Sequence, residues 1–167
     1  MNHGLDNDHQ VFFYEQDFYV LSNFSAFTLQ WDGRRFDTSE AAYHYEKFQG
    51  RPSLQELIRT APSAHEAFWV ARNNRRHARP DWDDCRLVVM LEILWAKVSQ
   101  HEYVRRKLLA TGDRQLIENS WRDSFWGWGE DRKGENWLGA LWMRLRGNLR
   151  AGDPPPVTAW SNRWVQP

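Results

Sequence analysis

The stretch from residue 83 to residue 99 carries apolar side chains at the spacing of one helix face, at Leu87, Met90, Leu91, Leu94 and Val98. Residues three and four apart lie on the same side of an α-helix, so these side chains form one buried stripe. A second stripe follows at Leu138, Leu141, Leu145 and Leu149. Both patterns favour a mainly helical protein.

A different period is found nearer the N-terminus, where apolar and polar residues alternate over residues 27–31. This alternation is typical of a half-buried strand, and Asp32-Gly33 then predicts a turn into a returning strand at Arg35-Phe36. We therefore expect a single compact α+β domain, mainly helical, with a small antiparallel sheet near the N-terminus. We place the domain at residues 11–151, after a disordered stretch at 1–10 and before a Pro-rich tail at 152–167.

Composition excludes several classes of protein. The chain has 167 residues, enough for one domain with a sizeable core. Cys85 is the single cysteine, which excludes an intramolecular disulfide and a cysteine-rich zinc site and favours a reducing, cytoplasmic setting. The charged residues balance, with 22 Lys+Arg and 22 Asp+Glu, which argues against a generally basic coat but leaves room for a local basic groove. The sequence has no apolar run of the roughly 20 residues that span a bilayer, so we expect no membrane segment.

Two partial motifs for metal or nucleotide binding fail on inspection. Each HExxH-like start, at residues 65–69 and 101–105, lacks the second His, because Trp69 and Arg105 stand there. The glycines of residues 129–134 have P-loop spacing, but Glu and Asn follow in place of Lys and Ser or Thr. We therefore expect neither a zinc protease nor a Walker-type NTPase, and no metal.

The first informative stretch is EAAYHYEK at residues 40–47. Glu40, Tyr43, His44 and Lys47 follow the i, i+3, i+4, i+7 spacing and share one helix face, which suits a catalytic stripe. The alternative is structural: Asp37 caps this helix, Glu40 closes the capping box from the third helical position, and Lys47 is solvated. Spacing alone favours this structural interpretation.

The second informative stretch is the predicted loop over residues 121–136, with three glycines and no helical stripe. Indoles beside charged groups suit a ligand made of a base and a phosphate, and glycine lets the backbone approach such a ligand closely. The same residues have structural interpretations, since Asn136 can cap the final helix and Trp82, among the 11 Trp of this chain, can be a core residue.

Several long segments of the sequence resemble the NADAR, or YbiA-like, family. They are LSNFSAF at 21–27, FDTSEAAYHYEKF at 36–48, LVVMLEILWAKVSQH at 87–101, LLATGDRQLIE at 108–118 and FWGWGEDRKGENWLGALWMRLR at 125–146. The chain departs from the family at Ala41, where His is usual, and at Trp128 and Trp137, which are bulkier than in many members. These departures bear on the size of the pocket and the choice of substrate.

The resemblance implies an N-glycosidase of mainly helical fold that needs no metal or organic cofactor. Its functional positions match Glu40, Trp82, Asp123 and Trp126, and the family's lysine is Lys47. Two substrate classes are implied: phosphorylated ribosylaminopyrimidine intermediates of riboflavin synthesis, which we favour, and ADP-ribose attached to guanine in DNA or RNA. A non-catalytic nucleotide-binding module is the alternative from another class.

The chemistry of both substrates suggests roles for these residues. Cleaving a ribose C1–N bond requires stabilisation of positive charge at C1 and protonation of the departing amine, which is work for carboxyl groups. We predict Glu40 as the acid/base, Asp123 as a stabiliser of the sugar, and Lys47 as the nucleophile of an alternative Schiff-base route. The predicted substrate-binding residues are Asn23, Tyr43, His44, Trp82, Trp126, Gly127, Asp131, Arg132, Lys133 and Asn136.

Overall fold

The computed structural model describes residues 4–15 and 18–153, and it divides into two compact units. Unit 1 combines residues up to Ser25 with His101–Asp153, and unit 2 holds Ala26–Gln100. The sequence predicted one domain over residues 11–151, and this part of the chain contains both units. Each unit has its own strand pair and its own helices.

Unit 2 begins with the predicted hairpin. Strands β2 (Leu29–Trp31) and β3 (Arg34–Phe36) pair antiparallel, with Leu29 opposite Phe36. Asp32 and Gly33 form the turn with positive φ angles of 49° and 65°, the conformation that two-residue hairpin turns require. The small antiparallel sheet is therefore confirmed, and the period-two pattern located it correctly.

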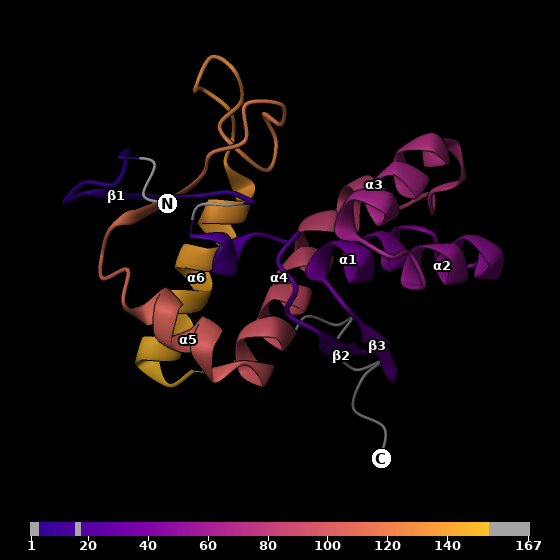
Figure 1. The fold of residues 1–167 in the computed structure, drawn as a ribbon, viewed down its shortest axis with the longest axis horizontal. Coiled ribbons are helices and arrows are strands. Elements are labelled where there is room, and N and C mark those ends of the chain that lie inside the picture. The colour runs from indigo at the N-terminus through magenta and orange to yellow at the C-terminus, as the bar shows by residue number, and fades with distance from the viewer. Residues whose placement is uncertain (1–3, 16–17, 154–167) are drawn as a thin grey trace. The chain divides into compact units, whose positions relative to one another are not determined.

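The remainder of unit 2 is helical. Helix α1 contacts α2, α3 and α4, and these helices gather around it in Figure 1. The predicted helix at 83–99 is confirmed as α4, and its buried face includes Met90, Ile93 and Leu94. The helical elements are α1 (Ser39–Lys47), α2 (Pro52–Arg59), α3 (Ala64–Asn73), the short 3-10 helix η2 (Arg75–His77) and α4 (Trp82–Gln100).

Unit 1 is built on a parallel strand pair. Strand β1 (Gln10–Phe13) pairs with β4 (Gln115–Glu118), with Val11 opposite Leu116. This pairing is not among the predictions from the sequence. Parallel strands need a long connection, and no local pattern links the two segments. The helical elements are η1 (Tyr19–Leu21), α5 (Glu102–Leu109) and α6 (Trp137–Ala151).

Helix α6 packs directly on β4, and a glycine permits this close approach. A Cβ atom at Gly139 would lie 2.1 Å from the carbonyl oxygen of Leu116, so no larger residue fits without moving the strand. One turn further along, the fully buried Trp142 donates its indole N–H to the carbonyl of Leu21 at 2.9 Å. These contacts fix the helix against the strand pair.

The predicted terminal segments are only partly within the described residues. Asp6 Oδ1 accepts a hydrogen bond from the backbone of Phe12 at 2.8 Å, and Asn7 N donates to Gln10 O at 3.0 Å. Helix α6 ends at Gly152 with a φ of 72°. Residues 1–3 of the expected disordered stretch and 154–167 of the expected tail lie outside the described residues.

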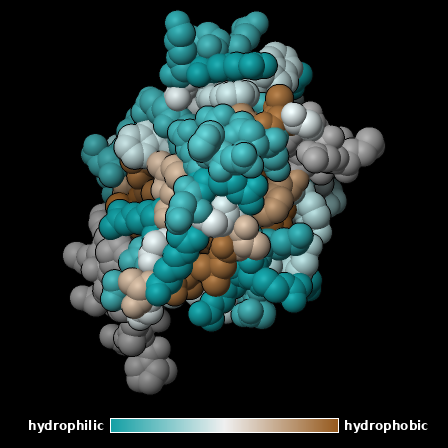
Figure 2. Space-filling view, turned by 90° about the vertical axis from the view of Figure 1, so that its left-hand side faces the viewer, coloured by the Kyte–Doolittle hydropathy of each residue, from teal (hydrophilic) through white to brown (hydrophobic). Residues whose placement is uncertain are grey.

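The surface in Figure 2 is mostly hydrophilic, with hydrophobic residues visible between polar ones. Among the described residues, no helix combines the length and the apolar composition that crossing a membrane requires.

Candidate functional site

Helix α1 begins one residue later than the capping prediction required. Thr38 has an extended backbone, and its Oγ1 accepts a hydrogen bond from Ala41 N at 3.2 Å, so Thr38 is the N-cap. Asp37 was the predicted cap and this prediction is wrong, because its carboxylate pairs with Arg35 at 3.1 Å instead. Glu40 is consequently the second helical residue, and its side chain takes no part in a capping box.

The Glu40 carboxylate is instead paired within the helix. Its Oε1 lies 2.8 Å from Nε2 of His44, one turn further along, and each residue is only 7% exposed. The other ring nitrogen, His44 Nδ1, is buried and has no hydrogen-bond partner among the described residues. A buried polar atom without a partner costs stability, so this arrangement is unusual for a purely structural pair.

Aromatic rings surround this pair. The ring of Tyr43 lies 5.2 Å from that of His44 and 4.8 Å from that of Trp82, the first residue of α4. Phe68 of α3 also approaches His44, with centroids 6.1 Å apart. Tyr43 and Trp82 were predicted from the sequence, whereas Phe68 was not, since no motif marks it. Trp82 is 6% exposed, so it is largely packed within unit 2.

Lys47 closes the same helix face at the end of α1 and is half-buried. Burial lowers the pKa of Lys47 below its usual value, while the charges of Asp83 and Glu40 act in the opposite direction. A lowered pKa increases the fraction of neutral amine near neutral pH, which is the form that attacks a carbonyl or an imine. The predicted stripe of Glu40, Tyr43, His44 and Lys47 is thus assembled on one helix.

In unit 1, the loop before α6 is held by its own polar side chains. Asp123 Oδ1 accepts backbone hydrogen bonds from Phe125 at 2.9 Å and from Trp126 at 2.8 Å. This interaction fixes the backbone at Trp126, whose ring meets that of Phe125 edge-on at 4.9 Å. One oxygen of the Asp123 carboxylate therefore stabilises the backbone of the loop.

The glycines of this loop allow close backbone packing. A Cβ at Gly127 would lie 2.9 Å from both Glu118 O and Ser120 Cβ, and Gly127 O accepts a hydrogen bond from Asn136 N at 3.0 Å. Gly127 was predicted to let the backbone approach a ligand, and the described structure shows it approaching other parts of the same chain.

The charged residues of the loop lie at its surface. Asp131 Oδ1 accepts a hydrogen bond from Lys133 N at 3.0 Å, and the Arg132 guanidinium lies 5.0 Å from the centre of the Trp128 ring. All three of Asp131, Arg132 and Lys133 are exposed. Their placement is compatible with contact to a soluble ligand.

The side chain of Asn136 joins α6 to strand β4. Its Oδ1 accepts from Glu118 N at 2.9 Å and its Nδ2 donates to Leu116 O at 2.9 Å. Asn136 stands at the N-cap of α6, but its side chain makes no capping hydrogen bond. The predicted capping role of this side chain is therefore wrong. The residue adopts a left-handed φ of 52°, which Asn tolerates better than most residues.

Asn23, the remaining predicted binding residue, is 5% exposed in unit 1. The structure therefore groups the predicted residues in two sets. Unit 2 brings together Glu40, Tyr43, His44, Lys47 and Trp82, and unit 1 carries Asn23 and the loop residues Asp123, Trp126, Gly127, Asp131, Arg132, Lys133 and Asn136.

Within residues 4–15 and 18–153 there is no group of three or more His, Cys, Asp or Glu side chains that could hold an ion. Cys85 is buried, and burial raises the pKa of its thiol, which makes it less reactive.

Comparison with known proteins places the chain among related sequences. The NADAR domain matches residues 12–150. The N-glycosidase YbiA of Shigella boydii is 37% identical over 133 residues, which cover 80% of this chain and 82% of that protein. The riboflavin biosynthesis protein VVA0006 of Vibrio vulnificus is 37% identical over 146 residues, 86% of this chain, but the match spans only 40% of that longer protein.

A solved structure gives the same result for the fold. The NMR structure of the E. coli protein YbiA superposes with a TM-score of 0.79 at 34% sequence identity, covering 89% of each chain. It confirms the predicted fold class, and the names of the relatives support the predicted class of enzyme, a hydrolase that acts on N-glycosyl bonds.

Proposed function

We propose that this chain, which belongs to the NADAR domain family, is an N-glycosidase. In this proposal it hydrolyses the bond between C1 of a ribose and an exocyclic amino group. The observation that carries the proposal is the buried pair of Glu40 and His44, with 2.8 Å between Oε1 and Nε2. A carboxyl group held in a largely dehydrated, ring-lined position is suited to acid/base work on a sugar.

In this proposal Glu40 acts through its second oxygen. The hydrogen bond with His44 occupies Oε1, which leaves Oε2 to protonate the departing amine or to stabilise positive charge at C1. His44 fixes the rotamer of Glu40, and the rings of Tyr43 and Trp82 offer flat surfaces for the heterocycle. Water then adds to C1, and the products are a free ribose phosphate and an amine.

Lys47 supports a second route to the same products. The ribosylamine opens its ring by breaking the bond between C1 and the ring oxygen, which gives an imine at C1. The neutral Lys47 amine adds to C1 and displaces the departing amine, and water hydrolyses the resulting Schiff base. The lowered pKa of Lys47 favours this route. Trapping with borohydride distinguishes the two, because only the Schiff-base route yields a reduced adduct on Lys47.

Asp123 and Trp126 occupy the other positions that match the family, and we assign them to substrate binding. Asp123 has one carboxylate oxygen engaged by the loop backbone, so we propose that its second oxygen stabilises the sugar. Trp126 would stack on the base. The phosphate contacts proposed for Arg132 and Lys133 rest on their exposed positive charge.

For the substrate we favour the phosphorylated ribosylaminopyrimidine of riboflavin synthesis. The name of the Vibrio vulnificus relative supports this choice, since it is called a riboflavin biosynthesis protein. ADP-ribosyl-guanine in a nucleic acid is the second candidate, because it presents the same C1–N bond to an exocyclic amine.

The test compares product release from both substrates. The purified protein is incubated separately with the ribosylaminopyrimidine phosphate and with an oligonucleotide carrying ADP-ribosyl-guanine, and released ribose phosphate or ADP-ribose is measured by chromatography. We expect Glu40→Gln, which keeps the shape and a hydrogen-bond acceptor for His44, to lower turnover about 10²- to 10⁴-fold.

Glu66→Gln is the matched control, because Glu66 is an exposed carboxylate in the first turn of α3. Turnover that survives in Glu40→Gln would remove Glu40 from the mechanism. A folded wild-type protein that binds either substrate without releasing product would favour the nucleotide-binding module instead.

A further inference from the structure

Helix α3 leads into the most basic stretch of this neutral chain. Residues 67–80 contain four Arg and no Asp or Glu. The helix ends at Asn73 and the short helix η2 follows at once, so the backbone turns and spreads these side chains over one region of unit 2. Arg72, Arg75 and Arg76 are exposed, and they line an open hollow of about 520 Å³ together with Asn73.

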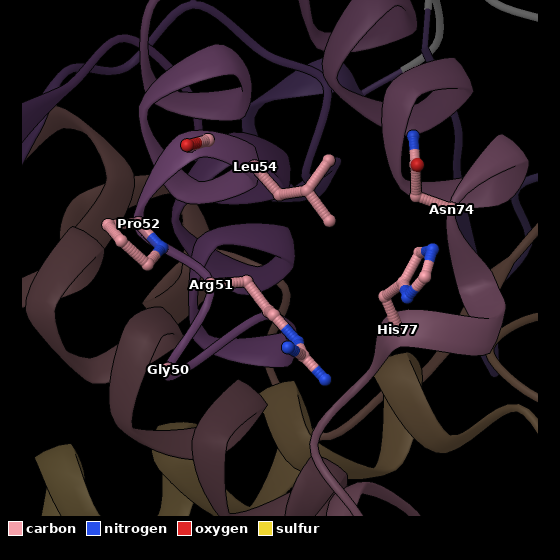
Figure 3. A pocket seen from close by; sticks show the side chains of 7 residues that line it. Gly50, Arg51, Pro52, Leu54, Asn74 and His77 are labelled. Carbon is pink, nitrogen blue, oxygen red and sulfur yellow. The ribbon is translucent and has the colours of Figure 1, made fainter.

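A second pocket uses the next residues of the same turn. It has a volume of about 400 Å³, with Arg51 and Leu54 on one side and Asn74 and His77 on the other (Figure 3). Arg76 Nε donates a hydrogen bond to His77 Nε2 at 3.0 Å. The permanent positive charge of this region belongs to its guanidinium groups.

These guanidinium groups are not neutralised by neighbouring carboxylates. Arg79 is the exception in the stretch, since it forms a bidentate pair with Asp81 at 2.6 and 2.7 Å. Arg51, Arg72, Arg75 and Arg76 form no ion pair with any residue that the structure describes. Their planar groups stay charged at all accessible pH values and match phosphate oxygens in geometry. We call these four residues the arginine face.

An exposed indole connects the arginine face to the Glu40–His44 pair. Trp69 is 50% exposed and its ring lies 5.2 Å below the Arg72 guanidinium. Trp69 also meets Phe68 edge-on at 5.6 Å, and the Phe68 ring lies 6.1 Å from that of His44. A series of ring contacts thus links the Glu40–His44 pair of α1 to Trp69 and Arg72 of α3.

We propose that Trp69 and the arginine face bind single-stranded nucleic acid, with the guanidinium groups on phosphates and one unpaired base stacked on the indole. A row of positive charges beside an aromatic platform is the combination that binds single strands without sequence preference. A small metabolite with one phosphate would not need four arginines spread over two pockets. The inference goes beyond the proposed reaction, because binding is measurable with an unmodified strand that cannot be hydrolysed.

The test is fluorescence anisotropy with a labelled thymidine oligonucleotide at several NaCl concentrations. We expect Arg75→Ala/Arg76→Ala to weaken binding about tenfold at low salt and to reduce the slope of log K against log salt by roughly 1.4, for two lost phosphate contacts. Trp69→Ala should weaken binding with an unchanged slope, while Trp69→Phe retains most of it.

Arg105→Ala/Arg144→Ala is the matched control, since it removes two exposed positive charges from helices of unit 1. If the control variant weakens oligonucleotide binding equally, the proposal is overturned, because the strand is then attracted by the total charge of the protein and not by the arginine face. Equal affinity for a duplex of the same length would contradict stacking on Trp69. Stronger competition by inorganic phosphate than by chloride at equal ionic strength would indicate a simple phosphate pocket. Since no step requires turnover, failure here leaves the N-glycosidase proposal untouched.

Discussion

The two units treat their polar side chains differently. Unit 2 buries ionisable groups: Glu40 and His44 are each 7% exposed, Glu46 is 3% exposed and Lys97 is fully buried. Unit 1 buries one such group, Arg146, which donates to Thr111 Oγ1 at 2.6 Å, but its loop and the start of α6 use Asp123, Asn136 and Trp142 to bind backbone. Side-chain bonds to backbone order an irregular chain, whereas burial of a charge costs free energy.

This difference distinguishes side chains that hold the backbone in place from buried ionisable side chains that are candidates for catalysis. The loop of unit 1 uses its side chains to hold its own shape, so a mutation there is expected to act first on stability. In unit 2, burial raises the pKa of the Glu46 carboxyl and lowers the pKa of the Lys97 amine, so their charged forms are disfavoured, and groups of this kind concentrate at functional sites. Three predictions test this contrast.

The largest expected effect concerns Lys97 in α4. Burial lowers the pKa of Lys97 to about 7, and its amine lies 5.2 Å from the centre of the Phe27 ring. The unfolded chain then binds more protons than the folded one between about pH 7 and pH 10, so the free energy of unfolding rises with pH over this range. Below about pH 7 the full cost of the buried amine is present.

We therefore expect Lys97→Met, which keeps the volume, to raise the free energy of unfolding at pH 6 by about 2–5 kcal/mol and to remove this pH dependence. Urea unfolding at pH 6, 8 and 9.5 measures both effects, with the exposed Lys133→Met as control. A gain that is the same at every pH would show that the amine is not the cause.

The second prediction addresses the scaffold of unit 1. Asn136→Gly keeps the left-handed backbone but removes the two hydrogen bonds to β4, which leaves a peptide N–H and a carbonyl without partners. We expect a loss of about 2–4 kcal/mol in the free energy of unfolding. Asn136→Asp retains the acceptor for Glu118 N and should lose less. If stability is unchanged in Asn136→Gly while turnover is lost, Asn136 belongs to the chemistry and the contrast between the units fails.

The smallest expected effect tests the positioning role of His44. His44→Phe keeps the ring packing against Tyr43 but removes the hydrogen bond to Glu40, and we expect turnover to fall about tenfold to a hundredfold. His44→Gln still offers a donor to Glu40 and should retain most of the rate. Circular dichroism checks that both variants fold. Equal losses in the two variants would mean that the imidazole itself, and not its hydrogen bond, is required.

The local patterns of the sequence predicted the elements with local causes. The apolar spacing located α4, the alternation located the β2–β3 hairpin, and the i, i+3, i+4, i+7 spacing placed Glu40 and His44 on one face. The capping prediction missed by one residue, because Asp37 and Thr38 are both good caps and only the backbone conformation selects Thr38. That one-residue difference decides that Glu40 takes no part in a capping box.

Other features depend on contacts between distant residues, and only the tertiary structure decided them. Strand β1 pairs with β4 across most of the chain, Phe68 approaches His44 from another helix, and Asn136 binds β4 instead of capping α6. Periodicity records which way a side chain faces along its own element, but not which surface will meet it. The sequence by itself therefore determined the helices, the hairpin and the residue types of the candidate site, while packing determined which polar groups hold the backbone and which are buried side by side, as Glu40 and His44 are.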